Sequence, residues 1–208
     1  MENREKILQA AADVYAEFGF RGATTRRIAN AADVNEVTLF RIFGSKEALI
    51  AEAIKCSSLG IETPVLPDSP VNPEPELTLW ATGHLARLRK RCPLMKTMMA
   101  ELGERPEVCQ SASEGPIRAS EQLCSYVRAL RSAGLAAADI HVETACAMLL
   151  GALFADAMGR DMMPSIFPQP AEAAPRLYSE LFLRSIGVPK LARRRSTVGT
   201  RAAGKAAR

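Results

Sequence analysis

Few residues of this 208-residue chain could carry out covalent chemistry, and the sequence does not group them. The two histidines, His84 and His141, have no nucleophile or metal ligand near them in the sequence, so each is expected in the core or in solvent. The five cysteines are an odd number with no two close together, a pattern typical neither of a disulfide framework nor of zinc ligands. No phosphate loop or catalytic triad motif appears. The sequence therefore predicts no enzyme activity, no cofactor and no metal site.

Polar side chains that can hydrogen-bond an anion or a base edge are concentrated instead between residues 24 and 43. They are Arg26, Arg27, Asn30, Glu36, Thr38 and Arg41. Apolar residues predicted to face inward stand between them: Ile28, Ala32, Val34, Leu39 and Ile42. This separation predicts two short helices joined by a tight turn, the second with an exposed polar face that suits a groove of nucleic acid.

Capping residues mark the helices around this segment. Apolar residues from Ile7 onward recur at steps of three and four, which predicts a helix that Gly19 can end in a left-handed conformation. Thr24, Asn35 and Ser45 can each N-cap one of the three helices that follow. In the last of these, the residues predicted on one buried face are Leu49, Ile50, Ala53 and Ile54.

The composition predicts an all-helical fold. Hydrophobic residues make up 48% of the chain and aromatic residues only 5%, with alanine, leucine and methionine abundant. The charged N-terminus does not resemble a secretory signal, and the longest apolar run, 145–155, is shorter than a membrane-spanning helix. We therefore expect a cytoplasmic protein that does not bind membranes.

Composition also divides the chain into parts. Residues 1–56 form the predicted N-terminal domain, and five prolines between positions 64 and 75 predict a linker or irregular loop over 57–75. Residues 76–189 form a predicted helical domain, with segments at 76–90, 93–104, 114–133, 139–160 and 172–187. Residues 190–208 carry seven basic and no acidic residues and predict a disordered basic tail, or an arm that adds non-specific attraction to DNA.

The N-terminal segment resembles the DNA-binding domain of the TetR (tetracycline-repressor) family over about 56 residues, with its helix-turn-helix at 24–43. The matching runs are Phe18-Gly19-Phe20, Thr24-Thr25, Ile28-Ala29, Ala32-Asp33-Val34, Thr38 to Phe43 and Ser45 to Leu49. The resemblance implies phosphate contacts by Thr25, Thr38, Phe40 and Lys46. The candidates for reading bases are Asn35, Glu36, Val37 and Arg41. Because residues 1–56 have as many acidic as basic residues, this prediction rests on pattern and not on bulk charge.

The sequence departs from the common family pattern at three places. Asp33 stands where the turn glycine is usual, and aspartate tolerates a left-handed conformation better than most residues. Phe40 stands where tyrosine is common and lacks its hydroxyl. Glu36 and Val37 replace basic or small residues, so they bear on which DNA sequence is bound.

The remaining helices are expected to provide a dimer surface and a ligand pocket. One helix-turn-helix presents one recognition helix, whereas specific operators usually have two half-sites, so a homodimer is expected. In the family the last two helices form that interface, and the candidates here are Ala147, Leu150, Gly151, Phe154, Leu177, Leu181 and Phe182. The pocket candidates are Trp80, Leu88, Met95, Met98, Met99 and Leu102, which ordinary core packing would also explain.

Together these features predict a sequence-specific transcriptional regulator that binds a double-stranded operator, a repressor released by a small, largely apolar effector. An alternative from another class is a helical small-molecule-binding protein or enzyme that uses its N-terminal helices only as a scaffold. The hypothesis for release is that the ligand shifts the helix that begins at Lys46 and so changes the spacing of the two recognition helices.

Overall fold

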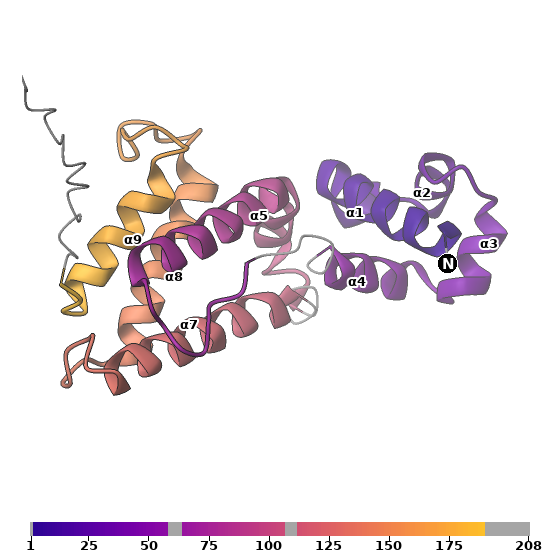
Figure 1. Ribbon diagram of the computed structural model, residues 1–208. Helices are drawn as coiled ribbons and strands as arrows, with labels where there is room; N and C mark the ends of the chain where they lie inside the picture. Colours follow the sequence, from indigo (N-terminus) through magenta and orange to yellow (C-terminus); the bar gives the residue numbers. More distant parts are fainter. Residues whose placement is uncertain (1, 58–63, 107–111, 190–208) are drawn as a thin grey trace, which may run out of the picture.

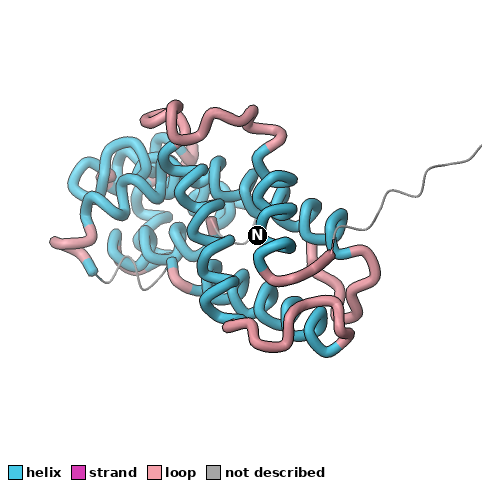
Figure 2. The backbone as a smooth tube through the Cα atoms, turned by 90° about the vertical axis from the view of Figure 1, so that its left-hand side faces the viewer, coloured by secondary structure: helices cyan, strands magenta, loops and turns pink. Residues whose placement is uncertain are grey.

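A computed structural model describes residues 2–57, 64–106 and 112–189, and it confirms the all-helical fold, because these residues form helices and loops but no strand (Figures 1 and 2). The basic tail at 190–208 lies outside the described residues. The helices are α1 (Glu2–Gly22), α2 (Thr25–Ala31), α3 (Glu36–Phe43), α4 (Lys46–Cys56), α5 (Pro73–Glu101), α7 (Glu114–Ser132), α8 (Val142–Gly159) and α9 (Ala174–Ser185).

Helices α1 to α4 share one hydrophobic core. Ile7 and Tyr15 of α1 are fully buried against Ile28 of α2, Leu39 of α3 and Ile50 of α4. The prediction for α4 is confirmed, since its four expected apolar residues are all buried. Helices α2 and α3 lie at the end of the molecule farthest from α9 (Figure 1).

The inward face of α3 differs by one residue from the prediction. Ile42 is 36% exposed, whereas Phe43 is 9% exposed and belongs to the core. Phe43 follows Leu39 by four residues, which places both side chains on one stripe of the helix. The prediction that Ile42 faces inward was therefore wrong.

A second core fills the C-terminal part, and the proline-rich segment is packed against it. Leu66 is 4% exposed within this core. A Cβ atom on Gly83 of α5 would lie 2.4 Å from Pro64 Cδ, so the segment runs against the helix where only glycine leaves room. Residues 64–72 are irregular in backbone, as predicted, but they are held to the domain, and residues 73–75 already belong to α5.

Helix α5 is a single helix, although two helices separated at Pro93 were predicted. Pro93 lies inside its 29 residues. Proline removes one hydrogen bond from a helix and costs about 3 kcal/mol in a helix interior. The helix continues because its two halves are buried in different cores, with Leu77 and Trp80 in the C-terminal core and Leu94 and Met98 in the N-terminal core.

A buried ion network joins α5, the end of α8 and α9. The Asp156 carboxylate is fully buried; Arg89 donates to it at 2.8 Å, Tyr178 at 3.0 Å, and Arg160 through two nitrogens. Burial alone would raise the pKa of Asp156, but the hydrogen bonds from Arg160, Arg89 and Tyr178 outweigh burial and hold the pKa below its usual value. This network fixes the orientation of α5 relative to α8.

Helix α8 is longer than the apolar run 145–155 indicated, and among the described helices it alone is long and apolar enough to cross a bilayer by length and composition. It packs against α5, α7 and α9. Its buried residues, among them Leu149 and Leu153, belong to the C-terminal core. Packing inside the bundle thus accounts for the apolar residues on the buried side of α8.

Candidate nucleic-acid interface and cavity

The N-caps of α2, α3 and α4 are formed as predicted. The Thr24 hydroxyl accepts a hydrogen bond from Arg27 N at 3.2 Å, and the Asn35 side chain accepts one from Val37 N at 2.9 Å. The Ser45 hydroxyl accepts one from Ala48 N at 3.1 Å. Each cap satisfies a backbone N–H that the first helical turn leaves without a partner, and so sets where the helix begins.

The turn between α2 and α3 requires a left-handed residue, and Asp33 supplies it with φ of 55°. Val34 N donates to Ala29 O at 3.0 Å, which closes the end of α2 over this residue. The predicted left-handed conformation of Asp33 is confirmed. The turn directs α3 away from α2, with α2 packed on α1 and α3 packed on α2 and α4.

Helix α3 exposes a face of mixed chemistry. Val37 is 72% exposed and Phe40 is 49% exposed, which is unusual for large apolar side chains. Asn35 and Arg41 are also exposed, and Thr38 is half-buried. An amide, a guanidinium and apolar groups on one helix can together contact base edges and thymine methyl groups in a major groove.

Two of the predicted contact residues bind each other. The Thr25 hydroxyl donates a hydrogen bond of 2.5 Å to the Glu36 carboxylate. Thr25 was predicted to contact phosphate and Glu36 to read bases. Because the hydroxyl proton already has a strong acceptor, a phosphate at Thr25 would have to compete with Glu36. Sequence reasoning missed this pair because the two residues lie on different helices.

Lys46, the fourth predicted phosphate contact, lies over an aromatic ring. Its Nζ is 4.1 Å from the centroid of the Phe20 ring, and the Arg105 guanidinium lies 3.2 Å from the same centroid. Burial lowers the pKa of Lys46, and the Arg105 charge adds to the effect while Glu47 and Glu101 oppose it. The Phe20 ring therefore joins the first residue of α4 to the segment that follows α5.

A cavity of about 380 Å³ lies between α5, α7 and α8. Its walls are mostly apolar side chains, and three nitrogen-bearing residues of α5 also reach it. The lining residues are His84, Arg87, Leu88, Arg91, Met95, Met98, Ala112, Gly115, Pro116, Leu150, Gly151 and Phe154. This volume falls in the range of ligand-binding sites.

Residues 7–53, which include the whole helix-turn-helix, match the sequence profile of the bacterial regulatory proteins of the tetR family. The N-terminal domain of this chain belongs to the TetR family. The protein is accordingly a DNA-binding transcriptional regulator, whose helix-turn-helix is formed by α2 and α3.

The chain is also similar to other regulators outside this segment. The uncharacterized HTH-type transcriptional regulator YvkB of Bacillus subtilis (strain 168) is 27% identical over 131 residues, which cover 63% of this chain and 69% of YvkB. The fatty acid degradation regulator FadR from Bacillus halodurans has the same fold, with a TM-score of 0.69, 19% identity, and 90% and 97% of the two chains covered. The flavonoid-responsive regulator FrrA also has this fold, with a TM-score of 0.65 and 22% identity, and the match covers 88% of this chain and 94% of FrrA.

The cavity contains some of the predicted pocket residues and not others. Leu88, Met95 and Met98 line it. Trp80 and Leu102 do not, because they lie one helical turn beyond its two ends; Trp80 is 1% exposed and donates to Gln122, and Leu102 follows the end of α5 at 47% exposure. Met99 is 54% exposed, since one residue after Met98 the side chain points roughly 100° further around the helix.

The predicted dimer-interface residues of this TetR-family chain are divided among three environments. Leu177 and Leu181 of α9 are 38% and 67% exposed. Phe182 is 5% exposed inside its own subunit, so its assignment to a surface was wrong. Leu150, Gly151 and Phe154 line the cavity, while Gly151 and Phe154 are also exposed, as is Ala147.

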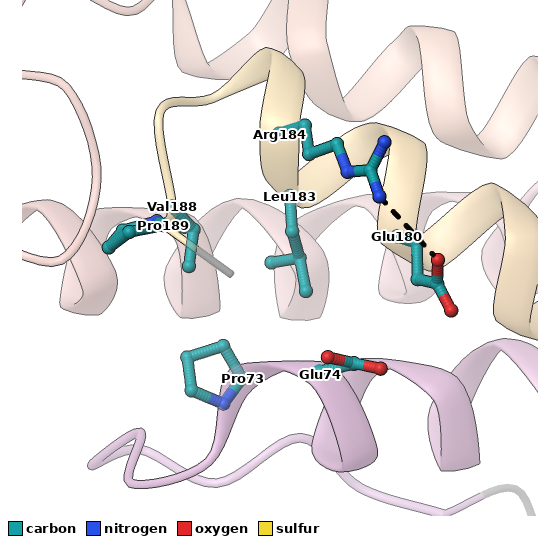
Figure 3. Close-up of a pocket in the computed structure, with 7 residues that line it drawn as sticks. All are labelled: Pro73, Glu74, Glu180, Leu183, Arg184, Val188 and Pro189. Carbon is teal, nitrogen blue, oxygen red and sulfur yellow. Dashed lines mark ion pairs between the residues drawn. The ribbon is translucent and has the colours of Figure 1, made fainter. Parts of the chain in front are cut away.

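A second, much smaller pocket lies where the end of α9 meets the start of α5 (Figure 3). Its volume is about 30 Å³, close to the share of one water molecule in the liquid, so it cannot hold an effector. Glu180 and Arg184, both on α9, form an ion pair of 3.9 Å at its edge. We assign this pocket to packing between the two helices.

Proposed function

We propose that this regulator is a homodimeric repressor that acts in the cytoplasm and leaves its operator when a small ligand fills the α5–α7–α8 cavity. The observation that carries the proposal is the position of α5. It lines the cavity through Leu88, Met95 and Met98, and its last turns pack in the same core as the DNA-binding helices. A change at the cavity therefore has a direct mechanical route to the recognition helix.

Specific hydrogen bonds hold this route together. The Glu101 carboxylate accepts from Phe20 N at 2.8 Å and from the Tyr15 hydroxyl at 2.9 Å, both in α1. The Thr97 hydroxyl donates to Ala16 O at 2.7 Å. A ligand that prefers one position of α5 would thereby also prefer one position of α1 and of the helices packed on it.

Exposed apolar residues support a dimer through α8 and α9. Met148 and Phe154 of α8 are 66% and 38% exposed, and Leu181 of α9 is 67% exposed. A second subunit placed against these helices would cover the apolar side chains and supply the second recognition helix that a two-half-site operator needs. Ala147 and Gly151 are small enough to allow close approach of the partner.

Responses to ligands are known among proteins of this fold, since FrrA is described as flavonoid-responsive. The chemical identity of the flavonoid does not transfer to this chain at 22% identity. The likeness supports only a proposal that the bundle senses a small molecule.

The DNA contacts can be tested by selecting bound sequences from random duplexes and measuring affinity for the selected site. Arg41→Ala should weaken specific binding by about 1–3 kcal/mol and relax the preference at one base pair in each half-site. Arg131→Ala, which removes the same exposed side chain from α7, is the matched control and should bind as the wild type does. Equal losses in both variants would refute the assignment of α3 as the reading element.

The dimer surface can be tested by adding one charge to it. Leu181→Glu should shift the protein toward monomers in sedimentation and weaken binding to a two-half-site operator, because a buried unpaired carboxylate is costly. Leu79→Glu is the matched control, since Leu79 is 61% exposed on α5. Dimers of unchanged stability in Leu181→Glu would exclude this face.

A further inference from the structure

The charged residues of the cavity do not fit a purely apolar ligand. Arg87 and Arg91 reach it from α5, and no described residue that lines it carries a carboxylate. The remaining walls provide mainly apolar groups, including Leu88, Met95 and Phe154. The site therefore combines a basic end with an apolar body.

The two guanidinium groups lack the partners that such groups normally have. Arg87 donates to His84 Nδ1 at 3.1 Å, and Arg91 donates to the Ser57 hydroxyl at 3.3 Å. Both acceptors are neutral. The Ser57 hydroxyl carries no charge, and the His84 ring is uncharged at neutral pH because burial and then the Arg87 charge lower its pKa to about 4. The Arg91 Nε atom is buried and has no hydrogen-bond partner among the described residues.

Repulsion between like charges adds to this deficit. Burial lowers the pKa of Arg87, as does the Arg118 charge, and burial and the Arg87 charge do the same to Arg91. Arg89 on the same helix has the carboxylate partner that Arg87 and Arg91 lack, because it forms an ion pair with the buried Asp156 at 2.8 Å. A buried charge without a counter-ion is unfavourable, so an anion in the cavity would remove a cost that the empty site carries.

We propose that the effector is an amphipathic anion whose carboxylate binds Arg87 and Arg91 and whose apolar part fills the cavity beside Met95, Met98 and Phe154. The inference rests on the proposed function, since it takes this cavity as the effector site. By comparison with the cavity of about 150 Å³ that holds benzene, the volume suits a ligand of roughly 15 non-hydrogen atoms. Guanidinium groups bind carboxylates through paired, charge-assisted hydrogen bonds.

The hydrogen bond between Arg91 and Ser57 explains how binding of the ligand affects the DNA-binding domain. Ser57, which accepts from Arg91, is the C-cap of α4 and donates to Ile54 O at 2.7 Å. A carboxylate is a stronger acceptor than a hydroxyl, so it draws the Arg91 guanidinium toward the cavity and away from the end of α4. Lys46 stands at the other end of that helix.

Two pairs of probes with matched skeletons test the charge of the ligand. Decanoate is compared with 1-decanol, and 1-naphthaleneacetate with 2-(1-naphthyl)ethanol, by calorimetry on the full chain and by release of the selected operator DNA. At least one acid should bind roughly tenfold or more tightly than its alcohol, the ratio expected of one charge-assisted hydrogen-bond pair. Decyltrimethylammonium should not compete.

Variants then place the anion. In the double variant R87M/R91M the acid should lose its advantage, while binding of the alcohol persists and shows that the cavity is formed. Lys96→Met removes one positive charge from an exposed position of α5 and should leave the ratio unchanged.

Acids that bind no better than their alcohols, or that keep their advantage in the double variant, would overturn the proposal. If the alcohols still release operator DNA in that case, the proposed regulator function stands and only the proposal of an anionic effector fails. If the protein binds no selected site at all, the proposed function itself fails.

Discussion

At the scale of single residues, the exposed Phe40 ring stands where the family resemblance implies a tyrosine. The ring is 49% exposed on the recognition helix, so a para-hydroxyl would point to the surface that contacts DNA. We predict that Phe40→Tyr tightens operator binding by about 1 kcal/mol, because it adds one hydrogen bond to a phosphate. Phe167→Tyr adds the same hydroxyl to a half-buried ring in the loop before α9 and serves as the control in fluorescence anisotropy titrations. Unchanged or weaker affinity of Phe40→Tyr would refute the phosphate contact.

His84 makes the stability of the protein depend on pH. It is 5% exposed, stacks on Trp80 at 4.9 Å, and has a pKa lowered from 6.5 to about 4 by burial and by Arg87. The unfolded chain therefore takes up a proton at higher pH than the folded chain does, and stability falls as pH falls from 6.5 toward 4. Between pH 7.5 and pH 5 this residue should cost the wild type about 2 kcal/mol of unfolding free energy.

The contribution of His84 can be isolated in the variant His84→Gln, which keeps a neutral polar group. Urea unfolding at the two pH values should show a smaller loss of stability in the variant than in the wild type. Loss of equal size in both proteins would mean that groups other than His84 account for the dependence.

At the scale of elements, predictions from the sequence succeeded where the interactions are local. The caps at Thr24, Asn35 and Ser45 and the left-handed Asp33 depend on neighbours within a few residues, and all four are formed. The sequence failed at Pro93, where burial of α5 in two cores outweighs a local helix-breaking tendency. It also could not show the Thr25–Glu36 bond or the convergence of α5, α7 and α8 on one cavity, because these depend on how helices pack.

The turn between α2 and α3 offers a test of its left-handed residue. Asp33→Gly should leave stability unchanged or raise it by up to about 1 kcal/mol, because glycine adopts positive φ without strain. Asp33→Ala should lower stability by about 1 kcal/mol, although alanine is the better residue in ordinary helices. Thermal unfolding of the two variants checks the order. A more stable alanine variant would contradict the conformation assigned to this turn.

At the scale of the whole molecule, α5 is the only described helix whose residues enter both hydrophobic cores. The basic end of the cavity, formed by Arg87 and Arg91, and the contacts of Thr97 and Glu101 to α1 lie on the same helix. Effector and DNA can thus influence each other without a contact between them, and thermodynamics requires the influence to be equal in both directions.

Glu101 is the residue whose loss should break this coupling. Glu101→Ala removes the acceptor of Phe20 N and of the Tyr15 hydroxyl, so α5 can move without carrying α1 with it. We predict that the variant still binds decanoate, but that operator DNA changes its affinity for decanoate less than in the wild type, by a factor that corresponds to about 1 kcal/mol or more. Glu104→Ala is the matched control, because Glu104 pairs with Arg21 at 3.3 Å through side chains that are 73% and 90% exposed, and such pairs contribute little. If Glu101→Ala keeps the full coupling, the Glu101 hydrogen bonds do not carry the signal, which must then pass through the Thr97–Ala16 bond and the packing of α5 on α1, or through Arg91 and the end of α4.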